Sequence, residues 1–319
     1  RVEQGKYPYA PESLLLENNG KGNFTVSWRK NLGMITHALI TDLKKEQPNV
    51  LAICGEWTSL LFFAYRDGII QEISNEVLQK PLKGWWNILH TSDLDGDGDK
   101  DLIAGNWGLN APCRASDKEP IELYYDDFDK NGFIDPLMCY YNEGISYPFA
   151  TRDEITDQMV GLRKKFITYD SYSNATLETV FTPEQLANSP KLEVNTLETM
   201  WFENINGQFT PRSLPPEANF SPVHAILTDD FDGDGSTDIL LGGNVAYTRI
   251  RIGRTDANYG CLLKGSGEKA SFSYIPQLSS GLNIKGEIRS LKSIQGLNLV
   301  KRILVGINNQ SPLILKRAH

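Results

Sequence analysis

The chain has 319 residues, a formal net charge of −8 at neutral pH and 40% hydrophobic residues, which is enough for one large domain with its own core. No apolar run approaches the roughly 20 residues that a membrane-spanning helix needs, so no membrane span is expected. No basic stripe with interleaved aromatic residues occurs, which argues against nucleic-acid binding. The chain begins at Arg1 without a signal peptide, so we expect the mature part or a fragment of a longer protein.

Short strands are expected throughout the N-terminal part of the chain. Residues 14–24 contain two apolar runs around a turn rich in glycine and asparagine, which predicts a β-hairpin. Two further strand-like runs follow, Ala38–Asp42 and Val50–Gly55. The connection between them keeps one acid, Asp42, and is otherwise filled by Lys-Lys-Glu-Gln at residues 44–47. We therefore expect no metal between these two strands.

Three acidic loops share the pattern D-x-D-x-[D/N]-G-x-x-D. They cover Asp93–Asp101, Asp127–Asp135 and Asp230–Asp238. Oxygen-bearing side chains stand at positions 1, 3, 5 and 9, and the glycine at position 6 permits the turn that brings the carbonyl of position 7 toward the same centre. One such loop would fit an ordinary acidic surface turn, but three copies of one pattern indicate a shared ligand.

A cage of oxygens suits a hard cation, and Ca²⁺ takes about six to eight oxygen ligands at about 2.3–2.6 Å. We therefore predict about three bound Ca²⁺ ions. The predicted ligands are Asp93, Asp95, Asp97, Asp99, Asp101, Asp127, Asp129, Asn131, Phe133, Asp135, Asp230, Asp232, Asp234, Ser236 and Asp238. An EF-hand does not fit, because position 12 holds Ala104, Met138 or Leu241 where an EF-hand needs glutamate. Three Ca²⁺ ions would change the net charge from −8 to about −2, so the acidity reflects ligand chemistry.

Residues 150–199 interrupt the strand pattern. Four apolar residues are spaced to share one helical face: Ile155, Met159, Leu162 and Phe166. Thr182 followed by Pro183 is typical of a helix N-cap with proline at the first helical position. We expect two or three short helices that cover a face or an edge of the sheets. Two roles fit such an insertion, a protective lid and a docking element for a partner or ligand.

Strand pairs and hairpins continue to the C-terminus. Trp201–Phe209 and Leu262–Phe272 predict hairpins, and a last, acid-poor unit begins near Gly286. A loop-linked strand pair plus a hairpin makes a four-stranded antiparallel unit, which cannot bury both faces alone; radial stacking in a β-propeller solves that problem. Residues 1–319 are therefore predicted to form an all-β β-propeller of about five units, in which residues 150–199 are a helical insertion, as a whole or as part of a larger propeller.

The segments after the first and third loops, Asp101–Asn106 and Asp238–Asn244, complete a repeat D-x-D-G-D-G-x-x-D-L-x-x-G-N that resembles the FG-GAP and VCBS repeats of integrin-type β-propellers. With Gly-Trp-Trp-Asn at 84–87 and Gly-Asn-Trp-Gly-Leu-Asn at 105–110, the chain is similar to large secreted VCBS-repeat proteins of Bacteroidetes-type bacteria, which often carry an ASPIC-type (cartilage-acidic-protein-like) module. The resemblance covers most of residues 12–317. It implies calcium-stabilised blades and an extracytoplasmic location, secreted or at the outer-membrane surface, and little about activity.

The cysteines and histidines form no catalytic pattern. The cysteines are Cys54, Cys113, Cys139 and Cys261. They lack paired spacing, so we expect no disulfide framework, although one bridge stays open. His90 and His224 precede acidic loops on strands expected to face inward, and we interpret both as core histidines. Because no serine nucleophile elbow and no HExxH motif occurs, we predict no catalytic residue.

The leading hypothesis is a calcium-binding extracellular β-propeller without enzymatic activity that binds a protein or a glycan at the bacterial cell surface. It rests on the three loops and on the missing catalytic set. The alternative is a glycan-active enzyme, a polysaccharide lyase or hydrolase, which needs a lysine, arginine or histidine beside an open calcium site. A third hypothesis, a subunit of an outer-membrane complex, requires a stable protein partner.

Overall fold

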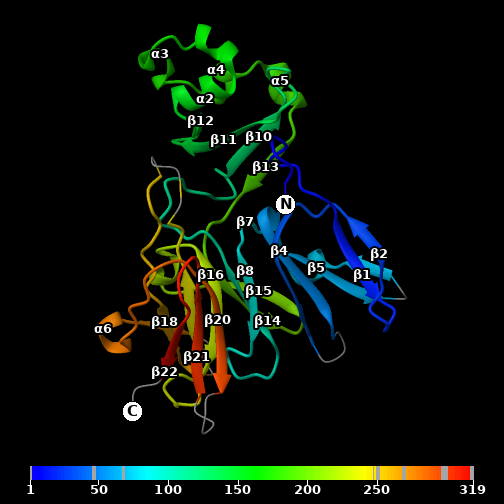
Figure 1. The fold of residues 1–319 in the computed structure, drawn as a ribbon, viewed down its shortest axis with the longest axis vertical. Helices are drawn as coiled ribbons and strands as arrows, with labels where there is room; N and C mark the ends of the chain where they lie inside the picture. Colours follow the sequence, from blue (N-terminus) through cyan, green and yellow to red (C-terminus); the bar gives the residue numbers. More distant parts are fainter. Residues whose placement is uncertain are drawn as a thin grey trace.

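The protein is all-β, with several antiparallel sheets and short helices (Figure 1). The computed structural model describes residues 2–44, 48–66, 69–246, 248, 252–267, 271–295 and 301–316. The all-β prediction is confirmed at this level. None of the described helices is long and apolar enough to cross a membrane.

The N-terminal part forms a hairpin and one sheet. The hairpin pairs β1 (Ser13–Asn18) with β2 (Phe24–Lys30), which confirms the prediction for residues 14–24. The sheet has the order β3-β4-β5-β6, and β7 also pairs with β4. Its strands are β3 (Met34–Thr41), β4 (Val50–Ser59), β5 (Leu61–Arg66), β6 (Ile69–Glu72) and β7 (Lys83–Trp85). Residues 45–47, in the connection where no metal was expected, lie outside the described residues.

Three further sheets have the orders β8-β9-β14-β15, β16-β17-β18-β19 and β20-β21-β22. Their strands are β8 (Ile88–Ser92), β9 (Asp101–Gly105), β14 (Met200–Ile205), β15 (Gln208–Ser213), β16 (Val223–Asp229), β17 (Asp238–Gly243), β18 (Cys261–Gly265), β19 (Phe272–Ile275), β20 (Ile288–Gln295), β21 (Lys301–Ile307) and β22 (Leu313–Lys316). The hairpin β14–β15 and the pair β18–β19 form where the sequence predicted hairpins.

Neighbouring sheets in this series share hydrophobic cores. Phe62 of β5 packs against Phe209 of β15, with ring centroids 5.6 Å apart. Ile103 of β9 shares a core with residues of β17 and β18, and Leu240 of β17 shares one with Val305 of β21. The first strands β3, β8, β16 and β20 lie next to one another in that order. Each sheet thus covers the face that its neighbour cannot bury alone.

A separate sheet is inserted between β9 and β14, two paired strands of one sheet. Its order is β12-β11-β10-β13. The strands are β10 (Ile121–Asp126), β11 (Asp135–Asn142), β12 (Ile145–Pro148) and β13 (Lys191–Val194). Figure 1 places it at one end of the molecule. The inserted sheet and its helices lie between residues 106 and 199. The helical segments α2 (Arg152–Gln158) to α5 (Pro183–Asn188) all fall within residues 150–199, where a helical insertion was predicted.

Short helices pack on the inserted sheet, and others occur in connections elsewhere. The helical segments are α1 (Ser74–Val77), α2 (Arg152–Gln158), η1 (Val160–Lys164), α3 (Tyr169–Ser173), α4 (Leu177–Val180), α5 (Pro183–Asn188), η2 (Pro216–Asn219) and α6 (Gln277–Ser280). Thr182 caps α5 as predicted, because its side chain accepts from the N–H of Gln185. The helix expected to run as far as Phe166 is broken: α2 ends at Gln158, and a 3₁₀ turn containing Gly161, a poor helix former, follows.

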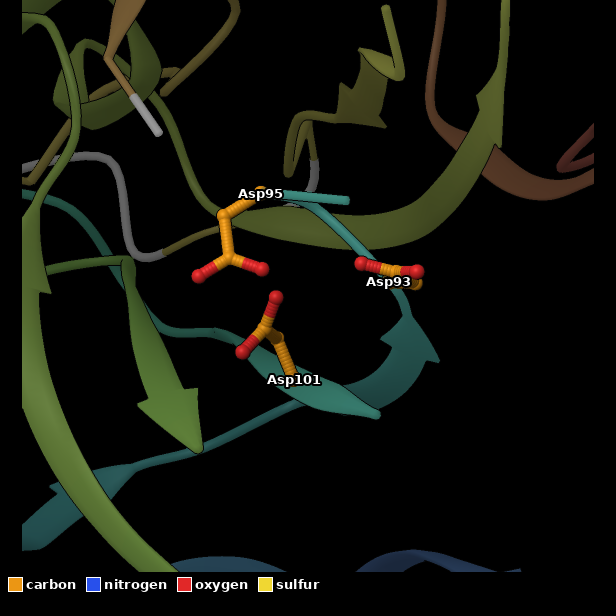
Figure 2. Close-up of side chains that lie close together, drawn as sticks. All are labelled: Asp93, Asp95 and Asp101. Carbon is orange, nitrogen blue, oxygen red and sulfur yellow. The ribbon is translucent and has the colours of Figure 1, made fainter. Parts of the chain in front are cut away.

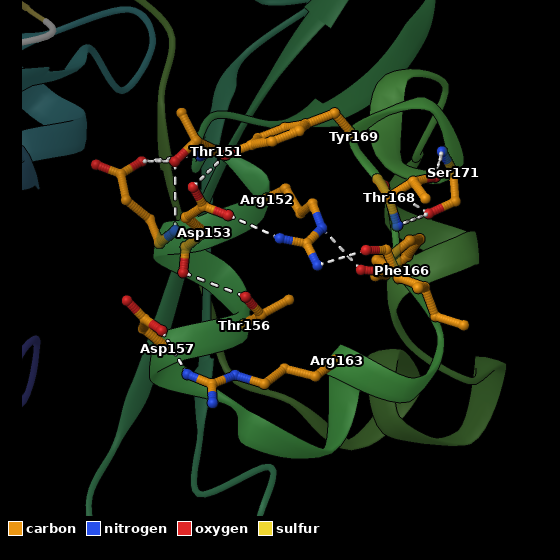
Figure 3. Close-up of polar contacts among 12 residues, drawn as sticks. Thr151, Arg152, Asp153, Thr156, Asp157, Arg163, Phe166, Thr168, Tyr169 and Ser171 are labelled. Atoms are coloured by element: carbon orange, nitrogen blue, oxygen red, sulfur yellow. Dashed lines mark hydrogen bonds and ion pairs between the residues drawn. The ribbon is translucent and has the colours of Figure 1, made fainter.

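The apolar residues of that expected helix still share one cluster. Ile155, Met159 and Phe166 are buried together with Leu137 of β11, and Leu162 packs against them. Polar contacts close the segment (Figure 3). Arg152 donates to the carbonyl oxygens of Phe166 and Ile167, both at 2.8 Å. The helical part of the insertion thus forms a layer of short helical segments that packs on β11.

Candidate metal centres

Each acidic loop joins two antiparallel strands of one sheet. The first loop links β8 to β9, the second links β10 to β11, and the third links β16 to β17. In the first loop, Asp93 Oδ1 accepts the N–H of Gly96 at 2.7 Å and Asp93 Oδ2 accepts that of Gly98 at 3.1 Å. Gly98 has φ of 94°, a conformation that favours glycine. The first aspartate therefore organises the turn with both of its oxygens.

The same turn recurs in the other two loops. Asp127 accepts from the N–H groups of Asn131 and Gly132, both at 2.8 Å. Asp230 accepts from Gly233 at 2.6 Å and from Gly235, the residue equivalent to Gly98, at 3.0 Å. The Oδ2 atom of each of these aspartates accepts one N–H and keeps a second lone pair, whereas Asp230 Oδ1 also accepts the N–H of Asp234 at 3.1 Å. Three loops far apart in the chain thus have one backbone geometry.

Three carboxylates converge in every loop, with one oxygen from each lying within 4.8 Å of the others. The groups are Asp93, Asp95 and Asp101; Asp127, Asp129 and Asp135; and Asp230, Asp232 and Asp234. Figure 2 shows Asp95 and Asp101 pointing toward each other across the first loop. The predicted ligands outside these groups are Asp97, Asp99, Asn131, Phe133, Ser236 and Asp238. The convergence of oxygens without nitrogen or sulfur is the donor chemistry of a hard cation.

The aspartate at position 9 has a second task that the sequence did not reveal. Asp101 is 1% exposed; its Oδ2 accepts the N–H of Leu94 in the loop and its Oδ1 accepts that of Asn204 on β14, both at 2.8 Å. Asp238 does the same with Phe231 and with Gly265 on β18, both at 2.9 Å. These carboxylates therefore join the loop to the third strand of the sheet. No local pattern identifies the partners, because they come from distant strands.

In the second loop, the aspartate at position 9 contacts a side chain of a helix instead of a third strand. Asp135 accepts the N–H of Phe128 at 3.1 Å and also hydrogen-bonds the side-chain amide of Gln158 on α2. Burial raises the pKa of Asp135 and raises the pKa of Asp101 to about 6, while the hydrogen bonds oppose the shift. A bound cation would lower both pKa values because it favours the carboxylate form.

A lysine enters the third loop. Lys264 on β18 lies 2.8 Å from Asp234 Oδ2 and also donates to Asp232. The strand registers place Glu203 of β14 at the equivalent position beside the first loop, since Asn204 and Gly265 are the equivalent N–H donors. Glu203 is one of the charges that raise the pKa of Asp95, after burial and two nearer aspartates. The two loops therefore face opposite charges.

Two histidines sit on the strands that lead into these two loops. Burial lowers the pKa of His90 on β8 and of His224 on β16 to about 4 each. His90 Nε2 lies 2.9 Å from Thr228 Oγ1. His224 Nε2 is buried without a hydrogen-bond partner among the described residues. The four cysteines are buried, and none of them forms a disulfide bond.

Comparisons with known proteins add little. No protein-family model matches the chain, and no curated protein matches it. Among solved structures, the N-terminal domain of Nup159 is similar over 94% of this chain and 80% of that chain, at 6% sequence identity and a TM-score of 0.24. A likeness at that score carries no argument about fold or function, so the function rests on the site itself.

Proposed function

We propose that the chain is a calcium-binding β-propeller module of the FG-GAP/VCBS type that binds a protein or a glycan at the bacterial cell surface. The observation that carries the proposal is the threefold recurrence of one loop geometry. In each loop the first aspartate holds the turn, and three carboxylates converge. Unrelated acidic turns would have no reason to share this arrangement.

Calcium fits these loops better than magnesium does. Magnesium requires a near-ideal octahedron and keeps several waters, whereas calcium accepts a flexible shell of carboxylates and carbonyls. The loops offer carboxylates at several positions of a flexible turn, together with the carbonyl of position 7. Extracellular calcium modules bind at about 10⁻⁴–10⁻³ M, which suits a location outside the cytoplasm.

The arrangement of the sheets supports the propeller. The sheets share cores in series, and their first strands lie side by side, as blades around an axis would. Each of the three acidic loops follows the first strand of a pair, so a cation in it would tie that strand to the next. In the first and third loops, position 9 extends this link to the third strand. The calcium ions would then act as structural staples, and partner binding would use another surface.

Calcium titration of the purified protein tests the proposal. We expect about three bound ions and a marked drop in melting temperature with EDTA, since a ligand at a hundredfold excess over its dissociation constant stabilises the folded state by about 2.7 kcal/mol per site. Equal stabilisation by magnesium, or no shift with EDTA, would overturn it. Turnover of a polysaccharide by the pure protein would favour the enzyme alternative over a binding module.

A further inference from the structure

A cleft lies between two neighbouring sheets, on the side formed by their last strands. One wall comes from β14, β15 and the connection that follows β15, the other from β19 and its flanking residues, and the cavity measures about 910 Å³. That volume lies within the range of about 300–1,000 Å³ typical of small-molecule sites. We call it the β15–β19 cleft; the residues that decide its chemistry are Trp201, Glu203, Arg212, Glu217, Phe272 and Tyr274. It is distinct from the loop interiors where the carboxylates converge.

Aromatic rings form one wall of the β15–β19 cleft. Phe272 and Tyr274 are two residues apart on β19, so their side chains project from the same face of the sheet. Both are half-buried, which leaves part of each ring open to the cleft. Trp201, only 2% exposed, packs edge-on against Phe272 with centroids 5.9 Å apart and fixes its orientation. The wall is therefore a rigid apolar platform.

Polar groups form the opposite wall. Arg212 donates through Nε and Nη2 to one oxygen of Glu203, Oε2, at 2.9 and 2.6 Å. Glu203 Oε1 and Arg212 Nη1 have no hydrogen-bond partner among the described residues, so an acceptor and a donor stand beside each other. The hydroxyl of Ser213 on β15 adds a group that donates and accepts, and Ser273 on β19 lines the cleft from the side of the aromatic residues. Apolar platform and mixed polar wall face each other across the cleft.

The charge of the cleft narrows the ligand class. Glu203 and Arg212 balance each other, while Glu217 has no ion-pair partner among the residues that the structure describes. The surplus is negative, so uronates and sulfated sugars would be repelled. An aromatic platform beside a polar wall of balanced charge fits the C–H faces and the hydroxyl groups of a neutral sugar.

We propose that the β15–β19 cleft binds a neutral oligosaccharide. The C–H faces of sugar rings stack on Phe272 and Tyr274, and their hydroxyls hydrogen-bond Glu203, Arg212 and the serines. The inference deepens the proposed function and rests on it, because it selects a glycan rather than a protein as the ligand and says where the ligand binds. It assigns no task to the calcium loops.

Isothermal titration in calcium-containing buffer tests the inference, with cellotetraose, xylotetraose and mannotetraose as neutral probes and tetragalacturonate as the acidic probe. We expect at least one neutral probe to bind and tetragalacturonate not to bind. Tyr274→Ala should weaken the neutral probe about tenfold by removing part of the platform. Tyr65→Ala is the matched control, because Tyr65 is 71% exposed on β5, in another sheet, and its loss should change nothing.

The outcomes separate the cleft from the rest of the proposal. If a neutral probe binds and Tyr274→Ala does not change its affinity, the β15–β19 cleft is not the binding site, although the protein still binds a glycan. Binding of tetragalacturonate alone, or of no probe, would overturn the inference, whereas an unchanged calcium titration of the same sample would leave the calcium-binding module intact. If the protein binds the glycan but takes up no calcium, the proposed calcium binding is wrong and the proposed glycan site in the cleft stands.

Discussion

The first and third acidic loops are nearly the same in sequence but differ in what surrounds them. Both begin with an aspartate that accepts the N–H groups of positions 4 and 6, and both end with a buried aspartate bound to the third strand. Beside the first loop, β14 presents Glu203; beside the third, β18 presents Lys264, which pairs with Asp232 and Asp234. The motif is shared and the electrostatic surroundings are opposite.

This difference shows that the motif alone does not set the affinity of a loop for a cation. The carboxylate of Glu203 still acts on Asp95 although it is paired with Arg212, so it adds to the attraction for Ca²⁺ at the first loop. The ammonium of Lys264 opposes the attraction at the third loop and occupies oxygens that a cation would use. Lys264 also balances the charge of the third loop when no cation is present. We therefore expect the first loop to bind calcium more tightly than the third.

The largest expected effect tests what the two loops share. Asp101→Ala or Asp238→Ala should each lower the free energy of unfolding by about 3 kcal/mol even in EDTA, because two buried N–H groups lose their acceptor. Urea denaturation at neutral pH measures this. Asp97→Ala is the control: Asp97 is exposed, so its loss should reduce calcium binding and leave the stability in EDTA nearly unchanged. Equal destabilisation by Asp97→Ala would contradict the special role of position 9.

A second effect compares the strands that precede the two loops. His90 and His224 have pKa values near 4 in the folded protein and about 6.5 when unfolded, so the unfolded state binds more protons as the pH falls below 6.5. Stability is therefore lost between about pH 6.5 and 4, by about 2 kcal/mol per histidine at pH 5. The causes beyond burial differ: Lys292 and His37 face His90, while Arg289 and Glu287 face His224.

Chemical denaturation at pH 7 and pH 5 measures the two contributions. His90→Gln and His224→Gln should each remove about 2 kcal/mol of the acid-induced loss, because glutamine does not titrate. His90→Gln gives up the contact with Thr228, so it should also lower stability at pH 7, whereas His224 Nε2 has no partner among the described residues to lose. A pH dependence that persists in both variants would show that the histidines are not its source.

The sequence predicted the features that a short segment determines by itself. The hairpin turns are local, because a few glycines and asparagines determine them, and Thr182 with Pro183 places the start of α5 in the same way. The convergence of carboxylates within each loop is local too. The additional sheet β10–β13 was not separated from the other units, because its strands carry the same strand–loop–strand pattern.

Long-range contacts could not be predicted in this way. Asn204 lies on β14, which the insertion separates from Asp101 in sequence. The residues next to Asp101 therefore do not predict that its carboxylate accepts the N–H of Asn204. Only the strand registers show that Glu203 and Lys264 occupy equivalent positions beside the first and third loops. The hydrogen bonds and the charges around a loop thus depend on neighbouring strands, and a local sequence pattern does not predict which strands will pair.

The last prediction reverses the charges that distinguish the two loops. Lys264→Glu should strengthen calcium binding at the third loop by about tenfold, and Glu203→Lys should weaken the first loop to a similar extent, because each changes the local charge by two units beside the cation. Terbium luminescence or calorimetry on proteins that keep one intact loop resolves the separate sites. Lys21→Glu, in the exposed turn between β1 and β2, makes the same charge change elsewhere and should move neither site. If Lys264→Glu shifted both sites equally, net charge rather than the neighbouring strand would set the affinity; salt would then abolish the effect, since distant charges are screened within about 10 Å at 0.1 M.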